Sequence, residues 1–127
     1  IYDIAPVQVI VPVSPNEAGI HQQDPVQMVR AWPGGGFLNI ELSIKTLNLA
    51  KHKLTFVDDS AAMYPGGVFL ELFHQGDGDS VTISKNILVS IPLAIYYERF
   101  NNQGFDIVFA VNTKEGFKHY TINIESL

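Results

Sequence analysis

The chain has 127 residues, 46% of them hydrophobic and 17% charged, which is the balance of a single globular domain and not of a disordered segment. Its 13 acidic residues outnumber its eight Lys and Arg, which are scattered singly, so we expect no nucleic-acid partner. The lack of cysteine excludes disulfides, thiolate metal sites and cysteine nucleophiles.

Residues 1–24 are expected to form a lead-in segment or linker. Residues 1–15 are rich in β-branched side chains, but three prolines exclude them from the interior of a sheet, which predicts an edge strand or an extended segment. Residues 16–25 are polar and end in Asp-Pro, a pattern typical of a loop. We therefore expect the folded domain to span residues 25–127.

Short strands separated by turn residues are predicted over the rest of the chain. Hairpins dominate the connections, so the strands are expected to be antiparallel. Residues 59–65 are expected to form a loop, and residues 94–100 are the one candidate for a helical turn. This pattern predicts an all-β domain of about eight short strands, a sandwich or a barrel. The expected strands lie within residues 27–32, 37–44, 51–58, 66–79, 81–84, 87–93, 105–112 and 117–125.

The strand within residues 66–79 is predicted to lie near the middle of a sheet. Val68, Leu70 and Leu72 form a wholly aliphatic face at strand period, while the opposite face carries Glu71 between two phenylalanines. Two glycines precede this apolar run, and a cluster of glycine and aspartate follows it.

His74, Asp77 and Asp79, at the end of this stretch, are candidate ligands for a hard cation such as calcium. The further ligands and closing glutamate of an EF-hand are missing, and a tight turn also requires Gly-Asp-Gly-Asp, so we favour turn chemistry. The four histidines lie in separate segments. A fold could gather two or three of them around zinc, but they lack His-x-His or His-x3-His spacing, so scattered positions are the preferred interpretation.

No catalytic motif stands out, and we expect neither an enzyme nor a bound cofactor. None of the serines lies in a Gly-x-Ser-x-Gly sequence, so a hydrolase triad has no support. The adjacent carboxylates of Asp58 and Asp59 stand at a strand end, where solvation explains them.

Aromatic side chains are the candidate ligand-binding residues, because their faces combine apolar area with an edge that forms hydrogen bonds. Trp32, beside a proline-glycine turn, and the pair Tyr96-Tyr97 are the expected surface aromatics, and Tyr64 is a further candidate. Packing in the core or at its rim is the preferred alternative for all four.

Several segments are diagnostic by their order and separation: DP at 24–25, VRAW at 29–32, GGFLNI at 35–40, HKLTFVD at 52–58, FLELFHQGDGD at 69–79, LVSIPL at 88–93 and GFKHY at 116–120. Together they resemble the C-terminal β-sandwich domain of the NigD-like proteins, envelope lipoproteins of Bacteroidales bacteria. The resemblance extends from about Asp24 to the end of the chain. Among the two architectures left open above, it implies an antiparallel β-sandwich.

The resemblance also implies an exported protein of the cell envelope, with a lipid-anchored parent in the outer membrane and no established catalytic residues. In that family an OB-like barrel and a lipid-modified cysteine precede the sandwich. We therefore expect residues 1–13 to be the last strand of that barrel or a linker, in a mature or trimmed soluble fragment.

Ser60 and Ser80 are candidate O-glycosylation sites. Each follows an aspartate and precedes an apolar residue, which resembles the sequon used on exported proteins of these bacteria, and both positions are expected in loops.

The leading functional hypothesis is a non-catalytic envelope domain that contacts an unknown envelope protein or glycan, in surface interaction or assembly. The first alternative is a glycan- or peptide-binding module that uses Trp32 and the tyrosines. The second is a bacteriocin-immunity protein, which the resemblance suggests because the family is associated with bacteriocin loci.

Overall fold

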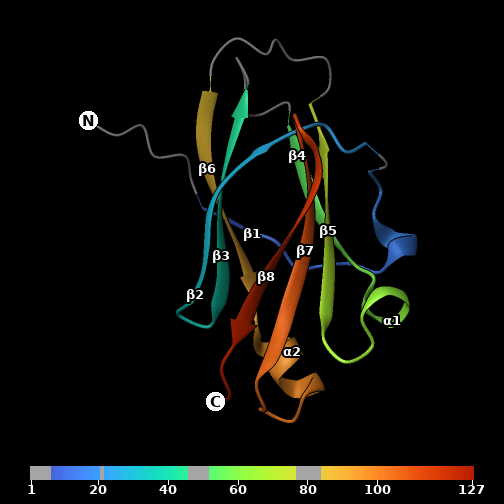
Figure 1. Ribbon diagram of the computed structural model, residues 1–127, viewed down its shortest axis with the longest axis vertical. Helices are drawn as coiled ribbons and strands as arrows, with labels where there is room; N and C mark the ends of the chain where they lie inside the picture. Colours follow the sequence, from blue (N-terminus) through green and yellow to red (C-terminus); the bar gives the residue numbers. More distant parts are fainter. Residues whose placement is uncertain (1–6, 21, 46–51, 77–83) are drawn as a thin grey trace.

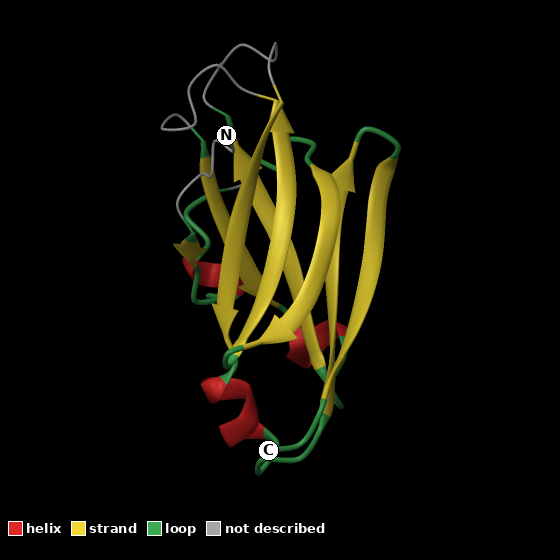
Figure 2. Cartoon of the chain, turned by 90° about the vertical axis from the view of Figure 1, so that its left-hand side faces the viewer, coloured by secondary structure: helices red, strands yellow, loops and turns green. Residues whose placement is uncertain are grey.

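The computed structural model describes residues 7–20, 22–45, 52–76 and 84–127, and it is the predicted all-β sandwich (Figure 1). Two four-stranded sheets pack face to face, with strand orders β1-β6-β3-β2 and β4-β5-β7-β8 (Figure 2). The strands are β1 Gln8–Val9, β2 Gln27–Gly34, β3 Phe37–Lys45, β4 Lys53–Asp58, β5 Val68–Gln75, β6 Ser84–Pro92, β7 Phe105–Thr113 and β8 Gly116–Ile124. The short helices are η1 Pro15–Glu17, α1 Ser60–Met63 and α2 Ala94–Arg99.

The core lies between the sheets and follows the predicted alternation most closely in β3. Leu38, Ile40, Leu42 and Ile44 are at most 1% exposed, whereas the residues between them are half-buried. Side chains from one face of β5, β6 and β7 complete the same apolar cluster. Burial of alternate residues on one face is what holds each strand in register.

Strand β5 occupies an inner position between β4 and β7, as predicted. Leu70 is fully buried in the core, in line with Val68 and Leu72. On the opposite face Glu71 is half-buried, but Phe69 is only 8% exposed. The second face of β5 is therefore partly covered.

Two strand pairs are parallel, which hairpin reasoning did not anticipate. After β5 the chain enters the other sheet as β6, and it returns to the second sheet through α2. Strand β7 then starts from the same end as β5 and pairs with it in parallel, from Val68 opposite Ile107 to Glu71 opposite Ala110. The second parallel pair joins β1 to β6.

The lead-in segment packs against both sheets. Strand β1 forms the edge of the first sheet, and the Ile10 N–H donates to the Ser90 carbonyl at 3.0 Å. Three residues further on, the Val13 N–H donates to Phe56 O at 3.0 Å and Val13 O accepts from the Asp58 N–H at 2.8 Å, on the edge of the second sheet. We call residues 8–13 the strap. An origin of residues 1–13 in an OB-like barrel stays a prediction.

Residues 22–26, expected to be a loop and the domain start, fill the space between β5 and β7. The His74 N–H donates to Gln22 O at 3.0 Å, and the Asp24 N–H donates to His74 O at 2.9 Å. On the other side, Asn112 Nδ2 donates to Gln23 O at 2.6 Å. A boundary near Pro25 therefore does not separate the preceding residues from the sandwich in space.

The helices are short. Helix α2 forms within the predicted helical turn. Residues 59–65 are not all loop as expected, because α1 forms at Ser60–Met63, where the Ser60 N–H donates to the Asp58 side chain. The strands expected at 81–84 and 87–93 are represented by the single strand β6, with residues 81–83 outside the described part of the chain. Among the described helices, none has the length and apolar character needed to cross a membrane.

Candidate functional site: a cleft at one end of the sandwich

A cleft of about 780 Å³ opens where the two sheets end, on the side away from α2. Its walls come from both sheets and from residues 24–26, which lead into β2. The residues that line it include Asp24, Val26, Met28, Lys45, His52, His74, Lys114, Glu115, Lys118 and Tyr120.

Two of the four histidines meet at the base of this cleft. Strands β4 and β5 are antiparallel neighbours with Leu54 opposite His74, so His52, just before β4, comes next to His74 near the end of β5. Nδ1 of His52 lies 2.6 Å from Nε2 of His74, and the rings stack with centroids 4.9 Å apart. The preferred expectation of scattered histidines is wrong for this pair.

The surroundings of His74 fix its protonation. Nδ1 of His74 lies 3.1 Å from the Asp24 carbonyl oxygen, which can only accept, so Nδ1 carries the hydrogen. In neutral His74, Nε2 then accepts from Nδ1–H of His52. Burial lowers the pKa of His74 and nearby His52 lowers it further, although Asp24 partly offsets both effects. The neutral form of His74 is therefore favoured, and its hydrogen bonds tie the end of β5 to residues 22–26.

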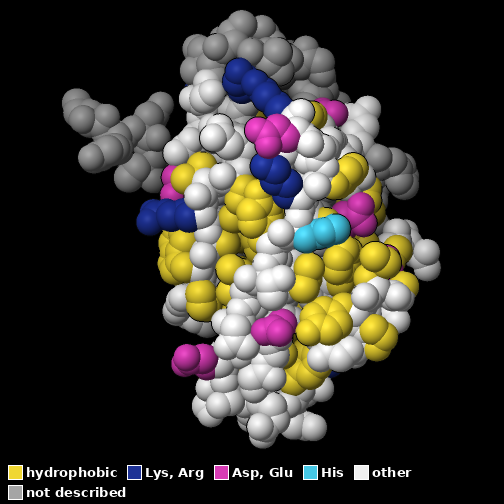
Figure 3. Space-filling view, in the orientation of Figure 1, with side chains coloured by type: hydrophobic (Ala, Val, Ile, Leu, Met, Phe, Trp, Pro, Cys, Tyr) yellow, Lys and Arg dark blue, Asp and Glu magenta, His cyan; other side chains and the backbone are white. Residues whose placement is uncertain are grey.

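Basic side chains gather at the mouth of the cleft. Lys45 ends β3 in one sheet, and Lys114 lies in the turn between β7 and β8 of the other. Contact with the Lys45 ammonium group lowers the pKa of Lys114, because each positive charge disfavours the other. Lys118 pairs with Glu115 at 2.9 Å. Figure 3 shows basic side chains in the upper part of one face of the molecule.

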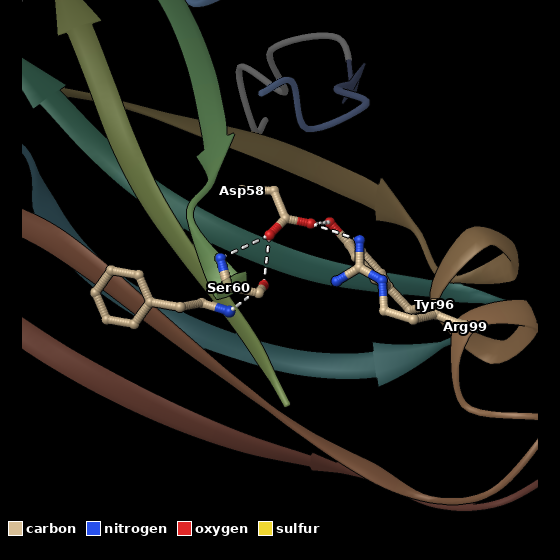
Figure 4. A network of polar contacts seen from close by, with 5 residues as sticks. Asp58, Ser60, Tyr96 and Arg99 are labelled. Carbon is tan, nitrogen blue, oxygen red and sulfur yellow. Dashed lines mark hydrogen bonds and ion pairs between the residues drawn. The ribbon is translucent and has the colours of Figure 1, made fainter. Parts of the chain in front are cut away.

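A second polar cluster lies at the other end of the sandwich and is centred on Asp58 (Figure 4). Asp58 Oδ1 accepts from the Ser60 N–H at 3.0 Å and from the Ser60 hydroxyl. Oδ2 accepts from the Tyr96 hydroxyl at 3.2 Å and from Arg99 Nη2 at 3.0 Å. The sequence suggested that solvation explains Asp58, and this expectation is wrong. The carboxylate instead accepts from the first residue of α1 and from two residues of α2, so it ties the two helices together.

The charges in this cluster are fixed by its hydrogen bonds. Burial alone would raise the pKa of Asp58, but the hydrogen bonds from Ser60 and Arg99 hold it below its ordinary value. Burial raises the pKa of Tyr96, and the neighbouring Asp58 carboxylate raises it further. Asp58 is thus ionised and Tyr96 protonated, an arrangement that stabilises the fold without activating a nucleophile.

The four candidate aromatics do not form one surface. Tyr96 is 1% exposed, so its expected position at the surface is wrong: α2 directs its ring into the core, against Phe105. Tyr97 is half-buried and its hydroxyl donates to Glu125 O at 2.8 Å. Trp32 lies on β2 of the first sheet, far along the chain from half-buried Tyr64 after α1. Their roles in ligand binding stay predictions.

Trp32 is half-buried and has a cation for a neighbour. The guanidinium carbon of Arg30 lies 4.5 Å from the centroid of the indole ring, while Nε of Arg30 pairs with Glu41 at 2.7 Å. One side of the ring is therefore occupied by a charge that is itself held in place.

The metal and glycosylation candidates have different outcomes. Asp77, Asp79 and Ser80 lie outside the described residues. Within the described ranges, no group of three or more His, Cys, Asp or Glu is arranged to hold a metal ion.

Ser60 is 7% exposed, and its Oγ accepts from the Phe69 N–H at 2.9 Å. Glycosylation of Ser60 stays a prediction, and it would require this bond to open.

Asp24, Lys45 and Lys114 were not among the site residues that the sequence predicts. The available signal was topological: residues that end strands at one edge of a sandwich lie together whatever their separation in sequence. Lys45 and Lys114 both stand at such ends, but only the pairing of the strands brings them to the same edge.

Taken together, the structure is an eight-stranded β-sandwich with a lined cleft at one end. The family model described as the NigD-like C-terminal beta sandwich domain matches residues 9–124. The chain belongs to this family, which confirms the resemblance seen in the sequence.

Solved structures share the fold. A NigD-like immunity protein from Bacteroides caccae is 26% identical, with a TM-score of 0.75 over 96% of this chain and 61% of its own. A protein described as toxin-related from Parabacteroides distasonis is 22% identical, with a TM-score of 0.76 over 94% and 62%. A protein of unknown function from Bacteroides vulgatus is 24% identical, with a TM-score of 0.70 over 97% and 58%. The chain thus spans less than two thirds of each, and no curated protein matches it.

Proposed function

We propose that this chain is a non-catalytic binding domain of an exported cell-envelope protein, and that its cleft holds a component of the envelope. The observation that carries the proposal is the cleft itself, which combines apolar walls with a basic mouth and draws side chains from both sheets. Membership of the NigD-like family supports it through the envelope location that the family resemblance implies.

The chemistry of the described residues supports a binding role over catalysis. His74 lies between the Asp24 carbonyl, to which its Nδ1–H donates, and the ring of His52, so both of its ring nitrogens have structural partners. The other polar cluster contains an ionised carboxylate and a protonated tyrosine, each bound to structural partners. Neither arrangement supplies an activated nucleophile.

Photo-crosslinking in the cells that make the protein tests the proposal. A benzoylphenylalanine at Gln27, an exposed residue of the cleft, should give an adduct in the envelope fraction. The same group at Glu98, exposed on α2 at the far end, should give none. Equal labelling from both positions, or recovery of the protein in the cytoplasmic fraction, would contradict the proposal.

A second candidate function for this envelope protein is protection of the cell against a bacteriocin. Its support is the solved relative at 26% identity, which is called a NigD-like immunity protein. Deleting the parent gene should then raise sensitivity to the bacteriocin made in the same community. Unchanged sensitivity would remove this candidate.

Glycan or peptide binding through Trp32 is the third candidate, supported by the position of the ring on the sheet beside the fixed Arg30 cation. Because Trp32 is the single tryptophan, its fluorescence reports on this site alone. Glycans or peptides that bind there should change the emission, and a flat response across a panel would argue against this role.

A further inference from the structure

The mouth of the cleft carries an excess of positive charge in a chain whose net charge is negative. Three of the eight basic residues, Lys45, Lys114 and Lys118, line this one cleft, although the formal net charge of the chain is -5. Charge is therefore concentrated where a ligand would enter.

The two acidic side chains of the lining have partners within it other than Lys45 and Lys114. An oxygen of the Asp24 carboxylate accepts from the Gly76 N–H at 2.8 Å, and the Glu115 carboxylate pairs with Lys118 at 2.9 Å. Among the described residues, neither carboxylate forms an ion pair with Lys45 or Lys114. Both ammonium groups line the cleft, one from each sheet, and Lys45 lies close enough to disfavour the charge on Lys114, so an anion bound between them would relieve their repulsion.

Below the mouth, the walls of the cleft are apolar and partly preformed. Val26 is 3% exposed, and Met28 is half-buried against the core. The Tyr120 ring is fixed by stacking on Phe109, with centroids 5.4 Å apart. A flexible thioether beside a fixed aromatic ring suits an alkyl chain of variable length, and a volume of about 780 Å³ is within the usual range of small-molecule sites.

We propose that the cleft binds an anionic amphiphile, with its phosphate or carboxylate head between Lys45 and Lys114 and its alkyl chain along Val26, Met28 and Tyr120. This inference rests on the proposed function of the cleft and names the class of ligand. Charge selects the head group and apolar contact holds the tail, so neither part alone should bind as well as the whole.

Calorimetric titration of the full chain with four probes tests this assignment, each probe below its critical micelle concentration. Octyl phosphate and octanoate carry both parts of the ligand, with the two head groups that the lysine pair accepts. Octyl glucoside carries the tail without the charge, and inorganic phosphate carries the charge without the tail. We expect octyl phosphate or octanoate to bind about tenfold or more tightly than either partial probe, and more weakly as salt is raised.

Variants locate the binding. The double variant Lys45→Gln with Lys114→Gln should weaken binding of the charged amphiphile about tenfold or more, because two charge-assisted contacts are lost. Both side chains are exposed, so the fold should be retained, which the urea midpoint checks. Lys53→Gln with Lys85→Gln changes the net charge equally outside the cleft lining and should leave the affinity unchanged.

Three results would overturn the inference: equal affinity for octyl glucoside, equal affinity in the two double variants, or no binding of either charged amphiphile. A cleft adduct from position 27 that is a protein, together with no amphiphile binding, would remove only this inference. No adduct at all together with tight amphiphile binding would leave the ligand class standing and remove the envelope assignment.

Discussion

His52 and His74 stack with 19° between their ring planes and share a single hydrogen bond of 2.6 Å, Nδ1 to Nε2. Burial disfavours the charged form of His74, and the neighbouring His52 disfavours it further, which is why the pKa of His74 lies below its ordinary value of 6.5. The contact therefore links the stability of the fold to pH.

The sign of this linkage follows from the two states. Unfolded His74 takes up a proton near pH 6.5, whereas folded His74 does so only at lower pH, so stability falls as pH drops through 6.5 toward the folded pKa. Urea unfolding at a series of pH values should show this loss. In the His74→Gln variant, the free energy of unfolding should depend less on pH below 6.5. The His119→Gln variant, changed at an exposed position, should keep the pH dependence of the original chain. A slope that persists in His74→Gln would contradict the assignment.

The two faces of β5 should differ in their response to truncation. Leu70→Ala removes a fully buried side chain and should cost about 2–5 kcal/mol in the free energy of unfolding. Phe73→Ala, at a half-buried position, should cost less, whereas Phe69→Ala should approach the cost at Leu70 because Phe69 is 8% exposed. Chemical denaturation of the three variants measures this. A larger loss at Phe73 than at Leu70 would show that the faces are exchanged.

Asp58 should be a strong single-site determinant of stability at the α1–α2 end. Both oxygens of Asp58 accept hydrogen bonds, so in Asp58→Asn the amide NH2 must face donors, either from Ser60 or from Tyr96 and Arg99. The lost hydrogen bonds should lower the free energy of unfolding by about 1–3 kcal/mol. Asp106→Asn is the matched control, because Asp106 accepts a single bond from Asn123. Equal losses for the two variants would mean that the Asp58 cluster adds no stability of its own.

The strap should protect two sheet edges at once. Removing residues 1–13 deletes the bonds of Ile10 to β6 and of Val13 to β4, which leaves both strands with unpaired backbone groups. We expect a lower urea midpoint and concentration-dependent association, measured by light scattering. Removing residues 1–6 keeps every described bond of the strap and serves as the control. A monomeric truncated chain of unchanged stability would show that the strap is dispensable.

Local patterns in the sequence account for the strands better than for their pairing. The alternation in β3 and the two-faced run of β5 identify their buried sides, because side chains on a strand alternate with a period of two. The parallel pairing of β5 with β7 depends on a path through the other sheet that no local pattern records. Helix α1 was missed because its start depends on a side chain, Asp58, that also bonds to α2.

The candidate site was less accessible from the sequence. His74 was noted for its place beside Asp77 and Asp79, yet its described partners are His52, 22 residues earlier, and Asp24, 50 residues earlier. Tyr96 was expected at the surface because a Tyr-Tyr pair gives no indication of which ring points inward. Helical geometry directs neighbouring residues to different sides, so Tyr96 is buried while Tyr97 is half-buried.

The hydrogen bond from Asn112 to Gln23 joins residues 89 positions apart. During synthesis residues 22–26 leave the ribosome early, but the gap that they fill exists only after β7 has been made. Their bonds to His74 can form once β5 has been made, but their bonds to Asn112 must wait for β7, and loop closure over such a distance makes folding slow. In that interval the edge of β5 that later pairs with β7 is open, and an open strand edge is a site at which chains associate.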